Sequence, residues 1–425
     1  MRREEIPLKN YNEWALGVCK RLGDWFEDLR EDFTALSKFE MELNHVKEWA
    51  NNAEYFSFLE ASRLTWLQAY PHYHQANDKE IGVIIQKAFD LYQKSTEARA
   101  GLLAHLHHDL GYSLSGLGQY SEALEHHKAA LSIRQEIYGI EHATTAQSYE
   151  GVGSCYENLG GYNESLVYAE RALNIHLKTY GEPNENTARS YNNMGTSLSL
   201  LGRYTEALVY QEKALNICVR LYGNDHPSSA IFYSNTGTIY QNLEEYQRAF
   251  EYKKIGLNTQ LKIYGEEHPV TARSYNSLGI TYNSLEKSQE GLVYQEKALA
   301  VFLISYGNEH PETARTYNSV GISYGNQKQY KKALEYIEKG LTIQQIMLGK
   351  HHPDTIQSHI NYATILSYQG SVYPAFQYLE KIGKELPKNH TKYSEFLDAK
   401  NLIRAKLPGS HPQQASRKSK KKKRR

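Results

Sequence analysis

The stretch HPVTARSYNSLG runs from His268 to Gly279, and the nearly identical HPETARTYNSVG runs from His310 to Gly321. The two copies are 42 residues apart, and other features recur at the same spacing. Tyr-Gly pairs lie at Tyr138-Gly139, Tyr180-Gly181, Tyr222-Gly223, Tyr264-Gly265 and Tyr306-Gly307. A second glycine column runs through Gly111, Gly153, Gly195, Gly237, Gly279 and Gly321. Self-similarity at one fixed period is typical of a repeat array, in which each unit packs on its neighbours.

One repeat unit has the pattern of two helices. Tyr275, Leu278 and Gly279 follow the i, i+3, i+4 spacing of one helical face, which predicts a first helix, helix A, over roughly 269–285. A second helix, helix B, is predicted over roughly 289–305. A glycine inside helix A costs about 1 kcal/mol in helix propensity. We therefore expect a neighbouring helix to approach closely at that position.

These residues resemble a known repeat family. The pattern Tyr275-x-x-Leu278-Gly279-x-x-Tyr282 is similar to helix A of the tetratricopeptide repeat, with Tyr in place of Trp. The 42-residue unit with its Gly-x-x-His-Pro turn resembles the kinesin light chain and nephrocystin-like class. The sequence departs from the family where Gln211 and Gln295 replace a common aromatic residue. The resemblance covers about residues 102–385 and implies an all-α, right-handed α-solenoid of about seven helix-turn-helix repeats.

The regions that flank the repeats suggest a domain order. Residues 1–79 are predicted to form an N-terminal helical cap, and residues 80–101 match a degenerate half repeat. The array is expected over 102–390, followed by a capping helix over 391–407. Residues 408–425 should be a disordered basic tail, because the stretch from Ser410 onward has no apolar residue beyond one alanine.

The N-terminal region is rich in aromatic residues, which leaves its role open. Its large aromatic residues are Trp14, Trp25, Phe26, Trp49, Phe56, Phe58 and Trp66. They fit a cap that covers the first repeat, or a surface for partner docking or self-association. The chain could also be a remnant of a larger multidomain protein.

Composition narrows the classes of function. Charged residues make up 23% and hydrophobic residues 40%, as is usual for a folded globular protein. The three cysteines are widely spaced, which favours a reducing, cytoplasmic setting over a disulfide framework. No apolar run reaches the roughly 18 residues of a membrane span. No nucleotide-binding, nucleophile or HExxH pattern is present, so we predict no enzyme activity and no cofactor.

The net charge of +1 conceals an asymmetry. The last nine residues carry eight positive charges, so the rest of the chain has a net charge of −7. The positive residues are Arg417, Lys418, Lys420, Lys421, Lys422, Lys423, Arg424 and Arg425. Such a cluster is typical of a nuclear import signal that contacts an importin, or of a polyanion-binding segment. It could also be a solvated end without a role, and a nuclear location has meaning only in a eukaryotic cell or host.

The groove that the resemblance implies gives a candidate site. Beside the core stripe, helix A carries a second stripe at i, i+3, i+7 and i+10. The predicted groove residues are Arg189, Asn192, Asn193, Thr196, Asn235, Arg273, Asn276, Asn283, Arg315 and Asn318. Asparagine can bond to an extended backbone, and arginine offers a planar fork to carboxylates. The second repeat is acidic at this stripe, with Glu150 and Glu157.

The histidines invite a comparison with metal sites. His105, His107, His108 and Asp109 lie close to His126-His127 in the sequence. A zinc site needs three or four converging ligands, and His105 and His107 do not share a helical face. We therefore predict no metal.

The function that these features favour is a non-enzymatic interaction scaffold or adaptor. Its concave groove is expected to bind a partner peptide that contains acidic residues. The alternative is an oligomerising structural or sensor piece that contacts its partners through the aromatic N-terminal region. The partner and the oligomeric state do not follow from the sequence.

Overall fold

A computed structural model of the chain describes residues 15–21, 46–51, 53, 57–69, 72, 77–96 and 99–407. Its helices are α3 (Phe58–Leu67), α5 (Asp78–Lys94), α6 (Ala100–Gly116), α7 (Tyr120–Tyr138), α8 (Ala143–Asn158), α9 (Tyr162–Tyr180), α10 (Glu185–Leu200), α11 (Tyr204–Tyr222), α12 (Pro227–Asn242), α13 (Tyr246–Tyr264), α14 (Pro269–Ser284), α15 (Ser288–Ser305), α16 (Pro311–Asn326), α17 (Tyr330–Met347), α18 (Pro353–Tyr368), α19 (Val372–Glu385) and α20 (Tyr393–Ala405). None of the described residues forms a strand. The predicted all-α repeat fold is therefore confirmed.

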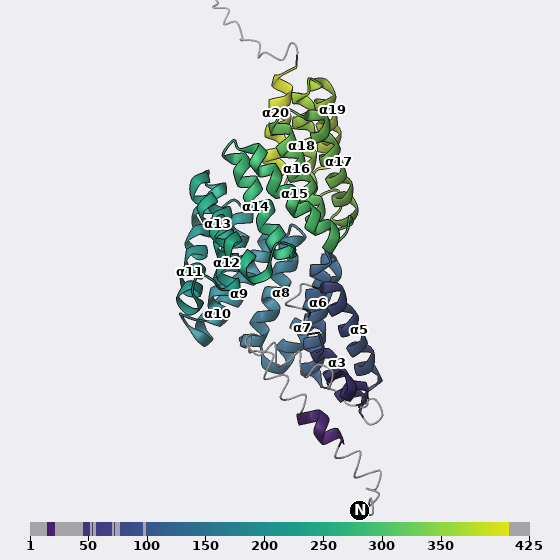
Figure 1. Cartoon of the computed structure of the whole chain (residues 1–425). Helices are drawn as coiled ribbons and strands as arrows, with labels where there is room; N and C mark the ends of the chain where they lie inside the picture. The colour runs from purple at the N-terminus through teal and green to yellow at the C-terminus, as the bar shows by residue number, and fades with distance from the viewer. Residues whose placement is uncertain are drawn as a thin grey trace, which may run out of the picture. The chain divides into compact units, whose positions relative to one another are not determined.

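The helices follow one another as A and B partners of successive repeats (Figure 1). Repeat 1 is α6 with α7, repeat 5 is α14 with α15, and repeat 7 is α18 with α19. Helix α5 lies where the half repeat is predicted, and α20 lies where the capping helix is predicted. Contacts divide the chain into two units, residues 1–316 and 317–425, and α16 crosses the boundary.

The linkers that precede α12, α14 and α16 share the motif Tyr-Gly-x-x-His-Pro. Gly265 ends α13 with a φ of 79°, a left-handed conformation that glycine adopts without strain. The Tyr264 ring stacks on the His268 ring at 4.6 Å between centroids. The Nδ1 atom of His268 accepts the Val270 backbone N–H at 3.2 Å and so caps α14. The Tyr-Gly-x-x-His-Pro motif therefore holds helix B of one repeat against helix A of the next.

The glycine column marks where helices A and B approach closely. A Cβ added to Gly279 would lie 2.8 Å from the backbone oxygen of Gly291 and 2.6 Å from Cγ of Gln295. Atoms at these distances clash, so no larger residue fits without moving helix α15. The close approach explains the glycine that helix propensity disfavours.

The tyrosines form aromatic pairs within each repeat. In repeat 5 the Tyr275 ring from helix A lies 5.9 Å from the Tyr294 ring of helix B, between centroids. The ammonium of Lys297 lies 5.5 Å from the Tyr275 ring centroid, close enough for a cation–π interaction. The columns that carry these pairs, copied from repeat to repeat, contribute many of the 35 tyrosines of the chain.

The ends of the array are covered by helices of the chain itself. Trp66 on α3 is buried, and its indole Nε1–H donates to the Asp109 carboxylate at 2.6 Å. Trp49 packs against the same core. In unit 317–425, Phe396 and Ile403 of α20 share a core with Leu379 of α19. The described part of the N-terminal region thus contributes to a core that continues into repeat 1.

Several predicted features lie outside the described residues. They include Trp14, Trp25, Phe26, Phe56 and the basic cluster at 417–425. The hypotheses of an import signal and of a polyanion-binding tail remain predictions.

Candidate peptide-binding groove

The second stripe of helix A is partly accessible in unit 1–316. The side chains of Arg189, Arg273 and Arg315 are 41%, 57% and 43% exposed. They project from α10, α14 and α16, at equivalent positions of three repeats. The same position holds Ile231 in repeat 4, which is also exposed. The groove therefore presents cations in repeats 3, 5 and 6, separated by an apolar step.

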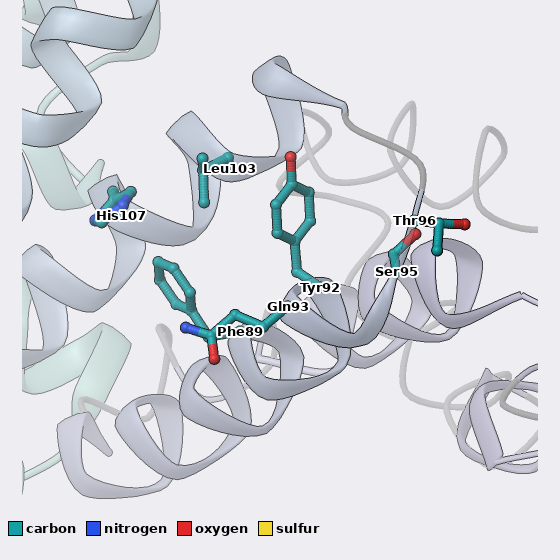
Figure 2. A pocket seen from close by; sticks show the side chains of 7 residues that line it. All are labelled: Phe89, Tyr92, Gln93, Ser95, Thr96, Leu103 and His107. Carbon is teal, nitrogen blue, oxygen red and sulfur yellow. The ribbon is translucent and has the colours of Figure 1, made fainter.

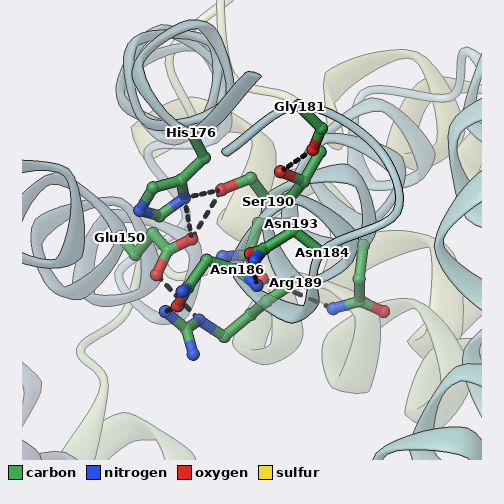
Figure 3. Close-up of polar contacts among 10 residues, drawn as sticks. Glu150, His176, Gly181, Asn184, Asn186, Arg189, Ser190 and Asn193 are labelled. Carbon is green, nitrogen blue, oxygen red and sulfur yellow. Dashed lines mark hydrogen bonds and ion pairs between the residues drawn. The ribbon is translucent and has the colours of Figure 1, made fainter. Parts of the chain in front are cut away.

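Arg189 is held by the acidic stripe of the preceding repeat (Figure 3). Its Nε lies 2.9 Å from Oε2 of Glu150, and its second nitrogen donates to Asn186 at 2.9 Å. The Ser190 hydroxyl donates to the other Glu150 oxygen at 2.7 Å. Burial lowers the pKa of His176, and the adjacent Glu150 partly offsets this effect. Glu150 is thus fully engaged in joining repeats 2 and 3.

Arg273 and Arg315 share a single carboxylate. Arg315 donates to Oε1 of Glu312 at 2.9 Å, whereas Nε of Arg273 lies 3.7 Å from the same oxygen. Within the described ranges the Arg273 guanidinium makes no hydrogen bond. Glu312 raises the pKa of Arg273 further above its ordinary value, so this side chain stays charged. Arg273 is therefore the groove cation with the most unused donor capacity.

The asparagines make contacts between repeats. Oδ1 of Asn192 accepts from Gln211 at 3.0 Å and from Asn235 at 2.8 Å. Asn276 and Asn318 are only 6% and 7% exposed. In unit 317–425, Asn318 donates to the Ser358 hydroxyl of the next repeat. We therefore assign Asn276 and Asn318 to repeat packing rather than to a ligand surface.

The remaining predicted groove residues are partly exposed. The side-chain oxygen of Asn193 accepts a hydrogen bond from Nδ2 of Asn192 at 3.4 Å. The Thr196 hydroxyl donates to the backbone oxygen of Asn192 at 3.0 Å, so its hydrogen bond is made within its own helix. Asn283 is half-buried on α14.

Repeat 1 meets the start of α16 within unit 1–316. Nε2 of His310 lies 2.9 Å from the backbone oxygen of Gly116, which is 194 residues away in the sequence. A Cβ added to Gly118 would lie 2.6 Å from Cδ of Pro311. The first five repeats therefore bend far enough for the end of α6 to reach the linker before α16.

This contact brings acidic side chains toward the groove arginines. Burial raises the pKa of the Asp78 carboxyl to about 6, and Arg273 opposes the rise. Burial likewise raises the pKa of the Glu157 carboxyl to about 7, against the effect of Arg315. Sequence comparison of neighbouring repeats had no signal for these long-range approaches. Which distant side chains come close to one another depends on the number of repeats per superhelical turn.

A buried lysine beneath the groove was not singled out by the sequence pattern. Lys253 replaces the glutamines Gln211 and Gln295 at the same column and is buried. Its ammonium donates to the Gln241 side chain at 2.5 Å and to the Thr281 hydroxyl at 2.9 Å. Burial lowers the pKa of Lys253 to about 7. Its polar partners lie on α12 and α14, so it links repeats 4 and 5.

The histidines of repeat 1 pair with one another across α6 and α7. Nδ1 of His107 lies 3.0 Å from Nδ1 of His126, and the rings of His108 and His127 meet edge to face. Among the residues that the structure describes, no group of three His, Cys, Asp or Glu side chains is placed to hold a metal ion. Within the same residues, no helix is long and apolar enough to cross a membrane.

Sequence comparison agrees with the repeat geometry. A family model described as tetratricopeptide repeat matches residues 102–178, 144–218, 186–257, 233–303 and 284–346, which together span more than half of the chain. The chain belongs to the tetratricopeptide repeat family. The matched segments consist of repeats with a period of 42 residues. Comparison with curated protein sequences gives no match.

Solved structures similar to this chain come from several systems. The Rap conjugation gene regulator of plasmid pLS20, in complex with the Phr* peptide, has a TM-score of 0.55 and 12% identity over 80% of this chain and 95% of that one. The apo quorum sensor NprR from B. thuringiensis has a TM-score of 0.54 and 15% identity over 88% and 97%. A chain described as a kinesin light chain with nearly identical TPR-like repeats, from Podosopora anserina, has a TM-score of 0.39 and 22% identity over 48% and 98%.

Proposed function

We propose that this tetratricopeptide repeat protein is an interaction scaffold whose groove in unit 1–316 binds an extended segment of a partner protein that carries acidic side chains. The observation that carries the proposal is the shared carboxylate of Glu312. Two guanidinium groups face one carboxylate, and Arg273 reaches it only at 3.7 Å. A carboxylate from a ligand would supply the hydrogen bonds that Arg273 does not make with Glu312.

The charge and geometry of the groove favour a carboxylate as the group that is recognised. Arginine presents several N–H donors in one plane, which match the two oxygens of a carboxylate. The pKa of Glu157 is raised to about 7, so its carboxyl is only partly ionised beside Arg315 near neutral pH, whereas Asp78, with a pKa of about 6, is mostly ionised there. Exposed Ile231 gives the same face an apolar contact between the cationic positions.

The structural neighbours support a peptide as the form of the ligand. The Rap conjugation regulator has the same fold and is seen with the Phr* peptide. Identity to it is low, so the likeness concerns the fold and not the ligand. The aromatic N-terminal surface is the less favoured alternative, because the described residues Trp49 and Trp66 pack into a core.

Fluorescence anisotropy of the full chain with labelled peptide pools tests this function. One pool carries Asp or Glu at alternate positions of a 12-residue peptide, and a matched pool carries Asn or Gln there. We expect the acidic pool to bind more tightly, and Arg273→Ala to weaken its binding about tenfold, as is usual for loss of a hydrogen bond to a charged group.

Arg220→Ala is the matched control. Arg220 is an exposed arginine in the last turn of α11, away from the helix A stripe. Its removal should leave binding unchanged. Equal affinity for both pools, or equal losses in the two variants, would contradict the proposal.

A further inference from the structure

The aromatic column of helix A changes at the first repeat. The column holds Tyr149, Tyr191, Tyr233, Tyr275 and Tyr317 in repeats 2 to 6. In repeat 1 the equivalent residue is His107, which lies 42 positions before Tyr149. In repeat 2 the Tyr149 hydroxyl accepts from Nε2 of Gln135 on the preceding helix B at 2.8 Å. The phenol thus bridges the joint between α7 and α8.

The joint between α5 and α6 lacks that phenol. Its helix B residue Gln93 is the equivalent of Gln135, again 42 positions earlier. Among the described residues the Gln93 side chain has no hydrogen-bond partner. Thr96 stands where the other linkers have a tyrosine such as Tyr138. Compared with the joint between α7 and α8, this joint therefore has the same glutamine but lacks the two tyrosine rings at the positions of His107 and Thr96.

A pocket of about 460 Å³ that is open to the surface, with Gln93 and Thr96 exposed at its rim, lies at this joint (Figure 2), and we call it the cavity. It is lined by Phe89, Tyr92, Gln93, Ser95, Thr96, Leu103 and His107. Gln93 and His107 both line it, so a tyrosine at position 107 in the orientation of Tyr149 would cross it. The cavity therefore corresponds to the position of the Tyr149 phenol in the joint between α7 and α8.

His107 is held away from Gln93 by its own partners. Its Nδ1 lies 3.0 Å from Nδ1 of His126 on α7. The Phe89 ring meets the His107 ring edge to face, at 4.8 Å between centroids. The hydroxyl of Tyr92 accepts the Arg99 backbone N–H at 3.2 Å, which fixes that wall of the cavity. The cavity thus has ordered aromatic walls and one free amide.

We propose that this cavity binds a phenol ring, supplied by a tyrosine side chain of a partner protein. The ring would lie between Phe89, Tyr92 and Leu103, and its hydroxyl would accept from Nε2 of Gln93. This arrangement reproduces the contact of Tyr149 with Gln135. The site is separate from the groove, because Leu103 and His107 lie on a different stripe of α6 from the groove-facing positions His105, His108 and Tyr112.

Saturation-transfer NMR of the full chain with p-cresol, the side-chain analogue of tyrosine, tests the site. We expect binding with a dissociation constant on the order of 1 mM, as is reasonable for eight heavy atoms. Toluene lacks the hydroxyl and should bind more weakly. Gln93→Leu should abolish the difference between the two ligands while it keeps the toluene signal.

His107→Tyr supplies the missing phenol from the chain itself. It should remove p-cresol binding and raise the melting temperature, since it would reproduce in the joint between α5 and α6 the contact that Tyr149 makes with Gln135. His359→Tyr makes the same chemical change in repeat 7 and should leave p-cresol binding intact. Because Gln93→Leu lies on the opposite wall, it tests the same site even where His107→Tyr fails to fold.

Three results would overturn the proposal. They are no p-cresol signal at 10 times the expected dissociation constant, equal p-cresol binding by wild type and folded His107→Tyr, and equal affinity of wild type for p-cresol and toluene. N-acetyl-tyrosinamide distinguishes the sources of the ring. If N-acetyl-tyrosinamide binds to wild type and not to His107→Tyr, the occupant is a partner's tyrosine. If p-cresol binds but N-acetyl-tyrosinamide does not, the occupant is a free phenol and the proposed occupant is wrong.

Discussion

Repeats 1 and 5 place aromatic rings at the same two columns but use different chemistry. Repeat 5 pairs Tyr275 with Tyr294, and repeat 1 pairs His107 with His126. The ring centroids lie 5.9 Å apart in the first pair and 5.1 Å apart in the second. The column thus decides that two rings meet, whereas the residue type decides whether the pair responds to pH. Phenols stay neutral well below pH 10, but imidazoles gain a proton in acid.

Of the predicted differences in stability between repeats 1 and 5, the one caused by acidification should be the largest. Burial lowers the pKa values of His107 and His127 to about 4, with further lowering by His126 for the first and by Arg134 and His126 for the second. A pKa below that of the unfolded chain means stability that is present above pH 6.5 and lost as pH falls toward 4. For buried His127 the loss reaches about 3 kcal/mol.

Hydrogen exchange at pH 7 and pH 4.5, corrected for intrinsic rates, measures this difference. Peptides from α6 and α7 should lose protection, whereas those from α14 and α15 should keep theirs. Asp78 and Glu157 oppose the trend, because their raised pKa values favour the acid form of the fold. The double variant His107→Tyr/His126→Tyr should make repeat 1 less sensitive. Equal losses in both repeats of the wild type would show that the histidines are not the cause.

Alanine at the glycine column should have opposite effects in two repeats. In repeat 5, a Cβ on Gly279 would lie 2.8 Å from a backbone oxygen, and we expect Gly279→Ala to cost about 2 kcal/mol. In repeat 2, a Cβ on Gly153 has its nearest neighbour at 3.4 Å, an ordinary contact. Gly153→Ala should be neutral or stabilising, since alanine favours the helix by about 1 kcal/mol.

Thermal unfolding followed by circular dichroism compares the two glycine variants. The melting temperature should fall for Gly279→Ala and should hold or rise for Gly153→Ala. A fall of similar size in both would mean that the close approach is not specific to repeat 5.

The linkers should give the smallest effect. His268→Ala removes the acceptor for the Val270 N–H and the stack on Tyr264, at a cost of about 1 kcal/mol. His268→Asn should cost about half as much, because Asn184 already caps α10 in this way, with its Oδ1 2.9 Å from the Asn186 nitrogen. Urea unfolding midpoints of both variants check the order. A larger loss for Asn than for Ala would exclude capping as the role of His268.

The sequence was sufficient for the parts of the fold that neighbouring repeats determine. The period of 42, helix α14 at Pro269–Ser284 and helix α15 at Ser288–Ser305 all follow from side chains that contact the next helix or linker. The predicted groove arginines are exposed on equivalent positions of helix A. The tetratricopeptide resemblance, given on the same residues, is confirmed by the family match.

Contacts between distant repeats could not be predicted from the sequence pattern, because they depend on the sum of the small rotations between successive repeats. The small twist between repeats decides that Gly116 meets His310, and no residue of either segment encodes that distance alone. Asn276 and Asn318 share the groove stripe by spacing, yet both side chains are buried, and Asn318 donates to Ser358 of the next repeat. The cavity beside His107 depends on which way one ring turns, and helical spacing does not determine that.

A charge-swap binding measurement tests the central claim, that Arg273 recognises acidic side chains in the groove. Affinities of wild type and of Arg273→Glu are measured by anisotropy for the acidic peptide pool and for a matched pool with Lys at the same positions, with Arg220→Glu as the control. Wild type and Arg220→Glu should both prefer the acidic pool. Arg273→Glu should shift the preference at least tenfold toward the lysine pool. An unchanged preference in Arg273→Glu would contradict the claim.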